Sequence, residues 1–205
     1  MHQEVITSKG KIILDRLDKF PDFYLAGGTG LALQLGHRIS VDFDFFWQED
    51  IPKELLSKIR KVFKGCRIEI VVNRLAQLTV EIDGVMISFV KYPFPVFSRL
   101  IDYKGIKILS PIGIAAMKAF ALGGRATLKD YVDLYFILKE KTVALEEIIA
   151  LCDKKYGNEF NQRLFLEELV YSKDIEEIEI NFLKEKVGKI AIEDFFEKEV
   201  KKIKI

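Results

Sequence analysis

The stretch VDFDFFW at residues 41–47 constrains the fold most, because acidic and large apolar side chains alternate along it. Alternation with a period of two is typical of a half-buried β-strand, whose successive side chains point to opposite faces. The aromatic side chains would then enter a core, while Asp42 and Asp44 would project together from the other face. Adjacent carboxylates repel each other, so a cation between them would explain the pair. Mg²⁺ or Mn²⁺ suits carboxylate oxygens, and a solvated strand face is the alternative.

A glycine pair, Gly27 and Gly28, comes before this strand and directly after a short apolar run at residues 23–26. We expect a strand-to-helix turn here, with Thr29 as the helix N-cap and Gly36 ending the helix. Glycines let backbone amides and a helix N-terminus approach a phosphate closely. Any tight turn would also explain the glycines. With the acids that follow, however, they predict a nucleoside triphosphate site, with amides for the phosphates and carboxylates for the metal.

Arg38 and Ser40 lie between the glycines and the acids, in the stretch GHRISVDFD. An arginine here could hold a phosphate oxygen with two hydrogen bonds, or it could form an ion pair with one of the aspartates. His37 is expected to be a turn residue rather than a metal ligand, because the chain contains only two histidines.

Two groups of charged residues stand out in the second half of the chain. Lys118 carries the one charge in IGIAAMKAFALGG, and it could reach an anion or extend to solvent, because burying an unpaired ammonium is costly. Asp130 and Asp133 share a face of the helix predicted over LKDYVDLYFIL, which is apolar almost all the way round. One of them could be the base that takes a proton from an attacking hydroxyl, or both could pair with Lys129, Arg125 or the backbone.

The order of these patterns predicts an α+β fold. Three apolar runs within residues 67–92, separated by turn residues, predict an antiparallel meander. Pro93 and Pro95 are expected to end the sheet, and later spacing is helical out to the end of the chain. We therefore expect a mixed sheet with flanking helices over residues 1–110, followed by a helical bundle over residues 111–205.

Composition limits the classes of partner. The formal net charge is +1, which excludes nucleic-acid binding through bulk positive charge but leaves a local basic surface open. Candidates for such a surface are Lys104, Lys107, Arg125 and Lys129. No apolar run reaches the length of a membrane span, and the first residues lack the pattern of a signal peptide, so a cytoplasmic location is expected.

The ordered motifs resemble the AbiEii-type nucleotidyltransferases, the toxin component of type IV toxin–antitoxin and abortive-infection systems. That family lies within the DNA polymerase beta-like nucleotidyltransferase superfamily. The similarity is carried by GGTGLALQLGHRISVDFDFF, AAMKAF and KDYVDLYFIL, and it covers about residues 20–140. It implies a minimal nucleotidyltransferase sheet followed by a helical bundle. It also implies an RNA acceptor, with tRNA known among relatives, or the protein itself as acceptor, and a cognate antitoxin as a candidate partner.

Individual positions carry the resemblance further. Asp42 and Asp44 match the metal-binding acids, and Ser40 matches a serine that in some relatives receives phosphate or lies beside the nucleotide. Of the two acids in the last motif, the second is the stronger candidate for an active-site role. The residues expected at the nucleotide are Gly27, Gly28, Thr29, Arg38, Ser40 and Lys118. Those expected in catalysis are Asp42, Asp44, Lys118, Asp130 and Asp133.

One position departs from the superfamily pattern. Many of its nucleotidyltransferases place a third carboxylate on a later central strand, where this chain offers Ser88. Asp133 could supply the missing acid, or metal binding could be weaker and the chemistry altered. The sequence predicts metal-assisted transfer of a nucleoside monophosphate from a triphosphate to an acceptor hydroxyl, with pyrophosphate leaving. A small-molecule acceptor and a nucleotide-binding module without turnover are the alternatives.

Overall fold

The fold is α+β, built on one mixed sheet of seven strands in the order β3-β4-β5-β2-β1-β7-β6. The computed structural model describes residues 1–125, 127–172 and 174–203. Parallel pairing joins β1 to β7 and β2 to β5, and the other neighbours are antiparallel. The strands are β1 Tyr24–Ala26, β2 Phe43–Trp47, β3 Ile68–Arg74, β4 Gln77–Ile82, β5 Val85–Lys91, β6 Leu100–Tyr103 and β7 Ile106–Leu109.

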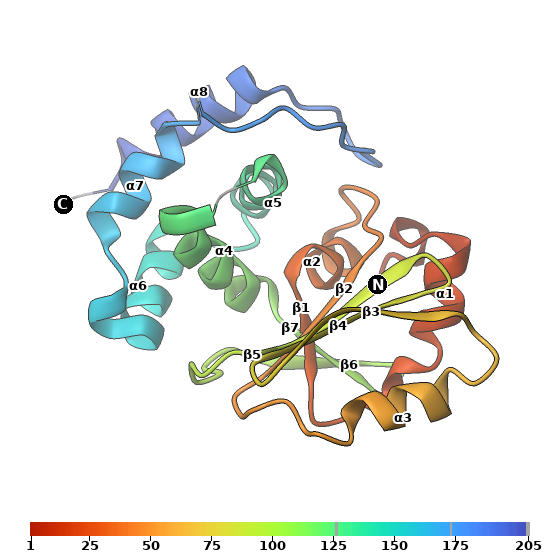
Figure 1. Cartoon of the computed structure of the whole chain (residues 1–205). Helices are drawn as coiled ribbons and strands as arrows, with labels where there is room; N and C mark the ends of the chain where they lie inside the picture. Colours follow the sequence, from red (N-terminus) through yellow and green to blue (C-terminus); the bar gives the residue numbers. More distant parts are fainter. Residues whose placement is uncertain (126, 173, 204–205) are drawn as a thin grey trace.

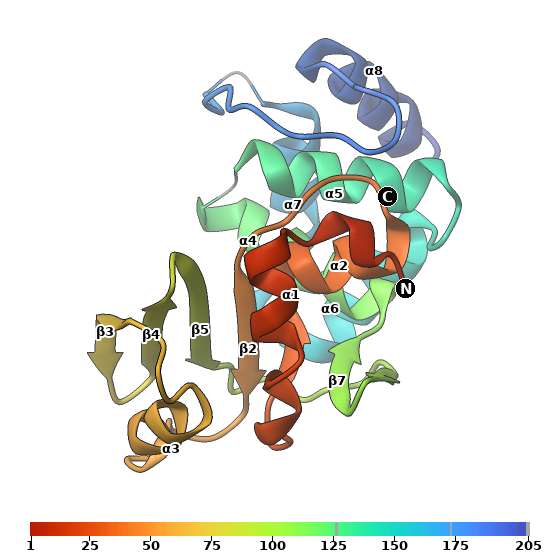
Figure 2. The ribbon, with the colours of Figure 1, turned by 90° about the vertical axis from the view of Figure 1, so that its right-hand side faces the viewer.

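Helices cover both faces of this sheet, as Figure 1 and Figure 2 show. One apolar cluster joins α1 and α3 to the sheet, and a second joins α4–α8 to one another and to β1, with α2 contributing to both. The helices are α1 Ser8–Leu14, α2 Gly27–Leu35, α3 Leu55–Val62, α4 Pro111–Arg125, α5 Leu128–Lys139, α6 Leu145–Tyr156, α7 Gln162–Val170 and α8 Lys189–Val200. The division into residues 1–110 and 111–205 stays a prediction.

The alternation along β2 is confirmed. Phe43 and Phe45 are buried in the cluster beneath the sheet, whereas Asp44 is half-buried and belongs to the other face. In the sheet, Asp44 lies opposite Ala26, the last residue of β1. Because α2 begins at the next residue, Gly27, the glycine turn at the end of β1 lies beside the start of the acidic strand β2, in the middle of the sheet.

Two expectations about the sheet half are wrong. The sheet does not end at the prolines, because β6 and β7 form a hairpin that adds to its other edge. Lys104 and Gly105 make the hairpin turn with positive φ, a conformation that two-residue hairpin loops favour. Thr29 is not the N-cap of α2, since the helix starts two residues earlier with Ala26 as its cap. Gly36 ends the helix in the left-handed conformation, as expected.

The second half also departs from the expected unbroken series of helices. Residues 176–188, which we call the strap, connect α7 to α8 without helical structure. The strap runs along α5 in Figure 2, beside the segment that leads from α2 to β2. Within the described parts of the chain, no helix is both long and apolar enough to cross a bilayer.

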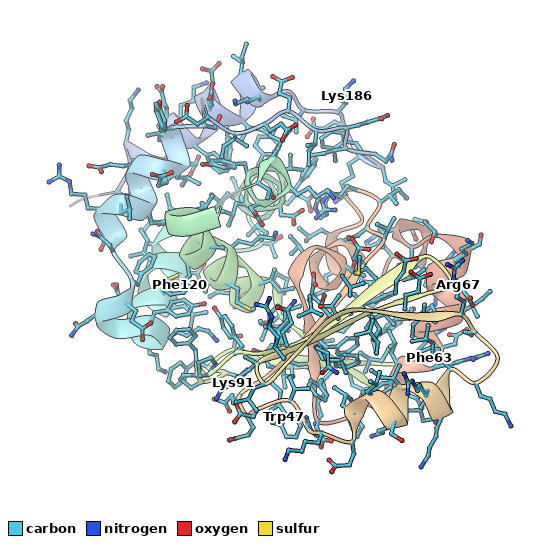
Figure 3. All side chains as sticks on the ribbon, in the orientation of Figure 1. Trp47, Phe63, Arg67, Lys91, Phe120 and Lys186 are labelled. Atoms are coloured by element: carbon cyan, nitrogen blue, oxygen red, sulfur yellow. The ribbon has the colours of Figure 1, made fainter. Side chains whose placement is uncertain are left out.

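Side chains fill the space between the sheet and the helices. Phe120 of α4 stacks on Tyr156 of α6 with 4.1 Å between ring centroids, and Figure 3 shows Phe120 in that layer. The hydroxyl of Tyr92, which follows β5, forms a hydrogen bond with the hydroxyl of Tyr156 at 2.8 Å. This aromatic layer joins the helical half to the sheet, because its rings come from both parts of the chain.

Candidate active site

A cavity of about 330 Å³ lies where the start of α2, the segment before β2, the helices α4 and α5, and the strap meet. Residues from distant parts of the sequence line it together. The predicted site residues among them are Gly28, Arg38, Ser40, Asp42, Asp44, Lys118 and Asp130. The predicted nucleotide and metal motifs therefore open into one shared space.

The two acids of the Asp-x-Asp motif differ in exposure. Asp42 is exposed just before β2, and Asp44 is half-buried within the strand. Ser88 on β5 is the parallel neighbour of Asp44, and its hydroxyl accepts a hydrogen bond from Thr79 at 3.2 Å. A hydroxyl thus stands beside Asp44, at the position where the resemblance led us to expect a third carboxylate. Among the described residues, no three acids, histidines or cysteines gather as a metal cluster.

Two carboxylates in one cavity still fit Mg²⁺ or Mn²⁺. Mg²⁺ is usually bound by one or two protein carboxylates, with substrate phosphates and water completing its shell. Asp42 and Asp44 supply that number of carboxylates, and both line the cavity. The donor set therefore suits an ion that arrives with a triphosphate better than an ion held by protein ligands alone.

Gly27 and Thr29 shape the cavity without lining it. Gly27 has a φ of +62°, and a Cβ at this position would lie 2.8 Å from Oδ2 of Asp44. Only glycine therefore combines this backbone conformation with the close approach of the acidic strand. Thr29 is buried, donates a hydrogen bond to the backbone oxygen of Asp42, and lies 2.7 Å from the Ser40 hydroxyl. It fixes the segment that carries both acids.

Asp133 does not reach the cavity, which corrects the expectation that it acts as the base or as an extra metal ligand. Its side chain is 0% exposed. One oxygen accepts from His37 Nε2 at 2.6 Å and from Arg38 Nε at 2.7 Å. The other accepts from Arg38 Nη2 at 2.9 Å and pairs with Lys118 Nζ at 2.7 Å. With both oxygens occupied in a dry site, Asp133 is an internal counterion.

Electrostatics keep this buried carboxylate ionised. Burial alone would raise the pKa of Asp133, but Arg38 and Lys118 outweigh it and hold that pKa well below its usual range. Burial would likewise lower the pKa of Lys118, yet Asp133 and Asp130 raise it. Asp133, Arg38 and Lys118 thus all stay charged at neutral pH.

In the structure both cations pair with carboxylates of the chain itself. Lys118, 8% exposed, does not extend to solvent. It pairs with two anions of the chain itself, Asp130 and Asp133. Arg38 forms an ion pair, and its partner is Asp133 rather than Asp42 or Asp44. Both cations nevertheless line the cavity, so their positive charge would attract a phosphate that enters it.

Asp130 lines the cavity while both of its oxygens are engaged. Oδ1 pairs with Lys118 at 2.8 Å, and Oδ2 accepts from the backbone and hydroxyl of Thr127 at 3.0 and 2.8 Å. The second arrangement is a capping box that starts α5. Asp130 therefore joins the helix start to the lysine.

Two features were missed by sequence reasoning. His37 lies after α2, as a turn residue would, but its ring is buried against Asp133. The strap adds residues 179–181 to the cavity wall. The alternation of glutamate and isoleucine in EIEI at residues 177–180, a strand-like pattern, could have indicated an extended segment there.

The predicted basic surface is only partly assembled at the cavity. Lys129 lines it. Lys104 pairs with Asp15 at 2.8 Å, and Lys107 donates a hydrogen bond to the backbone oxygen of Pro21 at 2.9 Å. Both lysines therefore contact the N-terminal segment of the chain and do not line the cavity. The side chain of Arg125 lies outside the described residues.

Comparison with known proteins decides the family. The family model described as "Nucleotidyl transferase AbiEii toxin, Type IV TA system" matches residues 12–93 and 65–202. The chain belongs to this AbiEii family. It is therefore a nucleotidyltransferase of a toxin family, and membership implies a nucleoside triphosphate substrate and an antitoxin partner.

Relatives of this AbiEii protein agree in sequence and fold. An uncharacterised protein of Aquifex aeolicus is 36% identical over 158 residues, which is 76% of each chain. The nucleotidyltransferase toxin MenT4 of Mycobacterium tuberculosis has a similar structure, with a TM-score of 0.64, 19% identity and coverage of 92% of this chain and 80% of that one. JHP933 of Helicobacter pylori gives 0.51, with 18% identity and coverage of 80% and 74%.

Gly28→Ala is expected to lower both stability and nucleotide affinity. A Cβ at Gly28 would lie 2.4 Å from Arg38 Nη2, and that guanidinium cannot move freely because Asp133 holds it with two hydrogen bonds. We expect destabilisation of about 1–3 kcal/mol, typical of overpacking. Chemical denaturation and calorimetric titration with a triphosphate measure the two effects. Gly124→Ala is the matched control, since no atom of the described residues lies within 4 Å of its added Cβ. An equal loss there would contradict the explanation.

Proposed function

We propose that this protein transfers a nucleoside monophosphate from a nucleoside triphosphate to a hydroxyl of RNA, such as a tRNA, with Mg²⁺ or Mn²⁺ bound by Asp42 and Asp44. The observation that carries the proposal is the shared cavity, which brings a glycine turn, two carboxylates and two buried cations together. The glycine turn can bind phosphate oxygens, and the carboxylates can bind the metal that accompanies them. The two cations can stabilise the negative charge of the phosphoryl group that is transferred.

Each side chain has a role in this scheme that follows from its place. The metal would neutralise phosphate oxygens when bound. Gly28 leaves room at the N-terminus of α2, where the amides of the first turn and the helix dipole favour an anion. Arg38 and Lys118 are held rigidly by Asp133, so they need no rearrangement as charge develops on the transferred phosphoryl group. Asp130 anchors the lysine in our proposal rather than acting as base, because both of its oxygens are already bonded.

RNA is the acceptor that the family resemblance supports, and one candidate for a phosphate contact, unpaired among the described residues, lies beside the site. Lys129 adds a cation to the cavity lining beside Arg38 and Lys118. Lysine and arginine near a reactive site attract nucleic-acid phosphates even when the net charge of a protein is small. The net charge of +1 excludes binding through bulk positive charge and leaves such a local surface open.

A second candidate function is a nucleotide-binding module without turnover. The observation in its favour is Ser88, which leaves Asp44 without a neighbouring carboxylate on β5. Two carboxylates can hold a metal through the triphosphate, but they hold it less firmly than three. Binding without transfer would then be the outcome.

Incubation of the purified chain with each α-labelled triphosphate, Mg²⁺ and total RNA tests the proposal. We expect label on RNA together with release of pyrophosphate. Label on the protein alone, or on an added small hydroxyl compound such as an aminoglycoside, would replace RNA as the acceptor. Tight calorimetric binding of a triphosphate with no pyrophosphate release would contradict turnover and support the binding module.

A further inference from the structure

His37 is a buried polar residue to which the proposed reaction assigns no role. Its side chain is 0% exposed, and its ring lies 5.1 Å from the ring of Phe136 between centroids. Its Nε2 is 2.6 Å from Oδ1 of Asp133, the same oxygen that accepts from Arg38. Two consecutive residues of one loop thus grip one carboxylate of α5.

The hydrogen bond fixes the orientation of the ring. An ionised carboxylate only accepts, so Nε2 of His37 must carry the hydrogen. Nδ1 is buried and has no partner among the residues that the structure describes. Turning the ring over would put the carbon Cε1 where Nε2 now donates to Asp133, so this hydrogen bond holds a single ring orientation.

The backbone of the same loop holds the strap. The carbonyl oxygen of His37 accepts from the amide of Leu183 at 2.9 Å and from that of Lys184 at 3.3 Å. Ile39 donates its amide to the carbonyl oxygen of Asn181 at 2.8 Å. The strap in turn places residues 179–181 on the wall of the cavity that the turn at Gly28 also lines.

We propose that His37 is a positioning residue, which ties the strap and the Arg38 guanidinium to the buried carboxylate of Asp133 so that both cavity walls keep their places. A purely apolar ring would fill the same space against Phe136, but it would not fix the loop to α5. The geometry thus assigns the polar contact, rather than the bulk of the ring, to this task. Its kinetic consequence rests on the proposed nucleotide transfer.

Hydrogen exchange tests the tie without any need for activity. His37→Phe keeps a ring and removes the donor, whereas His37→Gln keeps an amide donor near the position of Nε2. In His37→Phe we expect the amides of Leu183 and Lys184 to exchange at least about tenfold faster, the effect of losing one hydrogen bond to a charged group. His37→Gln should retain most of the protection. His2→Phe, at the chain's other histidine, which is half-buried and pairs with Glu4 rather than with Asp133, is the control.

Nucleotide kinetics then test the link to the cavity. We expect His37→Phe to raise KM for the triphosphate more than it lowers kcat, because the walls that bind phosphate become loose, and His37→Gln to restore KM. Unchanged exchange in His37→Phe would overturn the inference, as would faster exchange with an unchanged KM. A wild type that transfers no nucleotide counts against the proposed function instead, and triphosphate affinity by calorimetry then replaces KM. Should His37→Phe fail to fold, His37→Asn, whose shorter amide does not reach Asp133, makes the same comparison.

Discussion

Asp42→Asn is expected to reduce nucleotide transfer by about 10²–10³-fold, the loss typical of removing one group that stabilises charge in the transition state. An amide has nearly the shape of a carboxylate, but it lacks the charge that would hold the metal of the triphosphate. Asp42 is exposed and precedes β2, so the fold should not depend on that charge. We therefore expect kcat/KM to fall while the melting temperature stays near that of the wild type.

Growth inhibition in cells should disappear with the transfer activity, because the proposal assigns toxicity to the reaction. Asp50→Asn is the matched control, since Asp50 forms an exposed ion pair with Lys91 at 2.7 Å outside the cavity. We expect the control to retain both transfer and toxicity. Toxicity that survives in Asp42→Asn would show that the chain harms cells by another route, for example by binding.

Local sequence patterns predicted the parts of the site that depend on neighbouring residues. The period of two along β2 separates Phe43 and Phe45 from Asp44, because alternation is a property of any strand. The glycine turn was predictable for a similar reason. Residue 27 has a positive φ and lies close to Asp44, and only a glycine satisfies both conditions. The place of the turn beside the acids follows from the antiparallel pairing of β1 with β2, which the sequence patterns did not specify.

The buried ion cluster was not predictable in the same way. Asp133 meets Arg38 across 95 positions of sequence, and its two oxygens have the same chemistry whether they face a cavity or a core. Local pattern placed Asp133 on an apolar helix face, but it could not say which cation would reach it there. The long-range packing of α5 against the loop after α2 decided that question, and it turned a candidate base into a counterion.

The strap shows a related limit. Its cavity contacts depend on backbone hydrogen bonds to His37 and Ile39, and backbone groups carry no sequence pattern of their own. Phe182 lies 6.3 Å from Phe136 between ring centroids, which helps to seat the strap on α5. Side chains on the other side of the strap, such as Lys186, point away from the molecule in Figure 3. An extended segment could thus be predicted, but its register along the cavity could not.

Asp133→Asn is expected to lower the free energy of unfolding by about 3–5 kcal/mol, the loss typical of removing one partner from a buried ion pair. The asparagine fills the same volume, so the loss is electrostatic: Arg38 and Lys118 stay buried without the anion that compensates them. For a chain of this length, the melting temperature should fall by about 6–20 °C. Chemical denaturation of both proteins at pH 7 measures the difference. Asp50→Asn, at an exposed pair, should cost no more than about 1 kcal/mol.

The pH dependence of this difference separates charge from packing. The folded-state pKa of Asp133 is depressed, so its ionisation stabilises the protein at any pH above the unfolded value of about 3.9. As the pH falls below that value towards the folded pKa, the advantage of the wild type should shrink by about 1.4 kcal/mol per pH unit. Between pH 5 and 8 the advantage should stay constant. A difference that persists undiminished at pH 3 would mean that shape, rather than the charge of Asp133, holds Arg38 and Lys118 at the cavity wall.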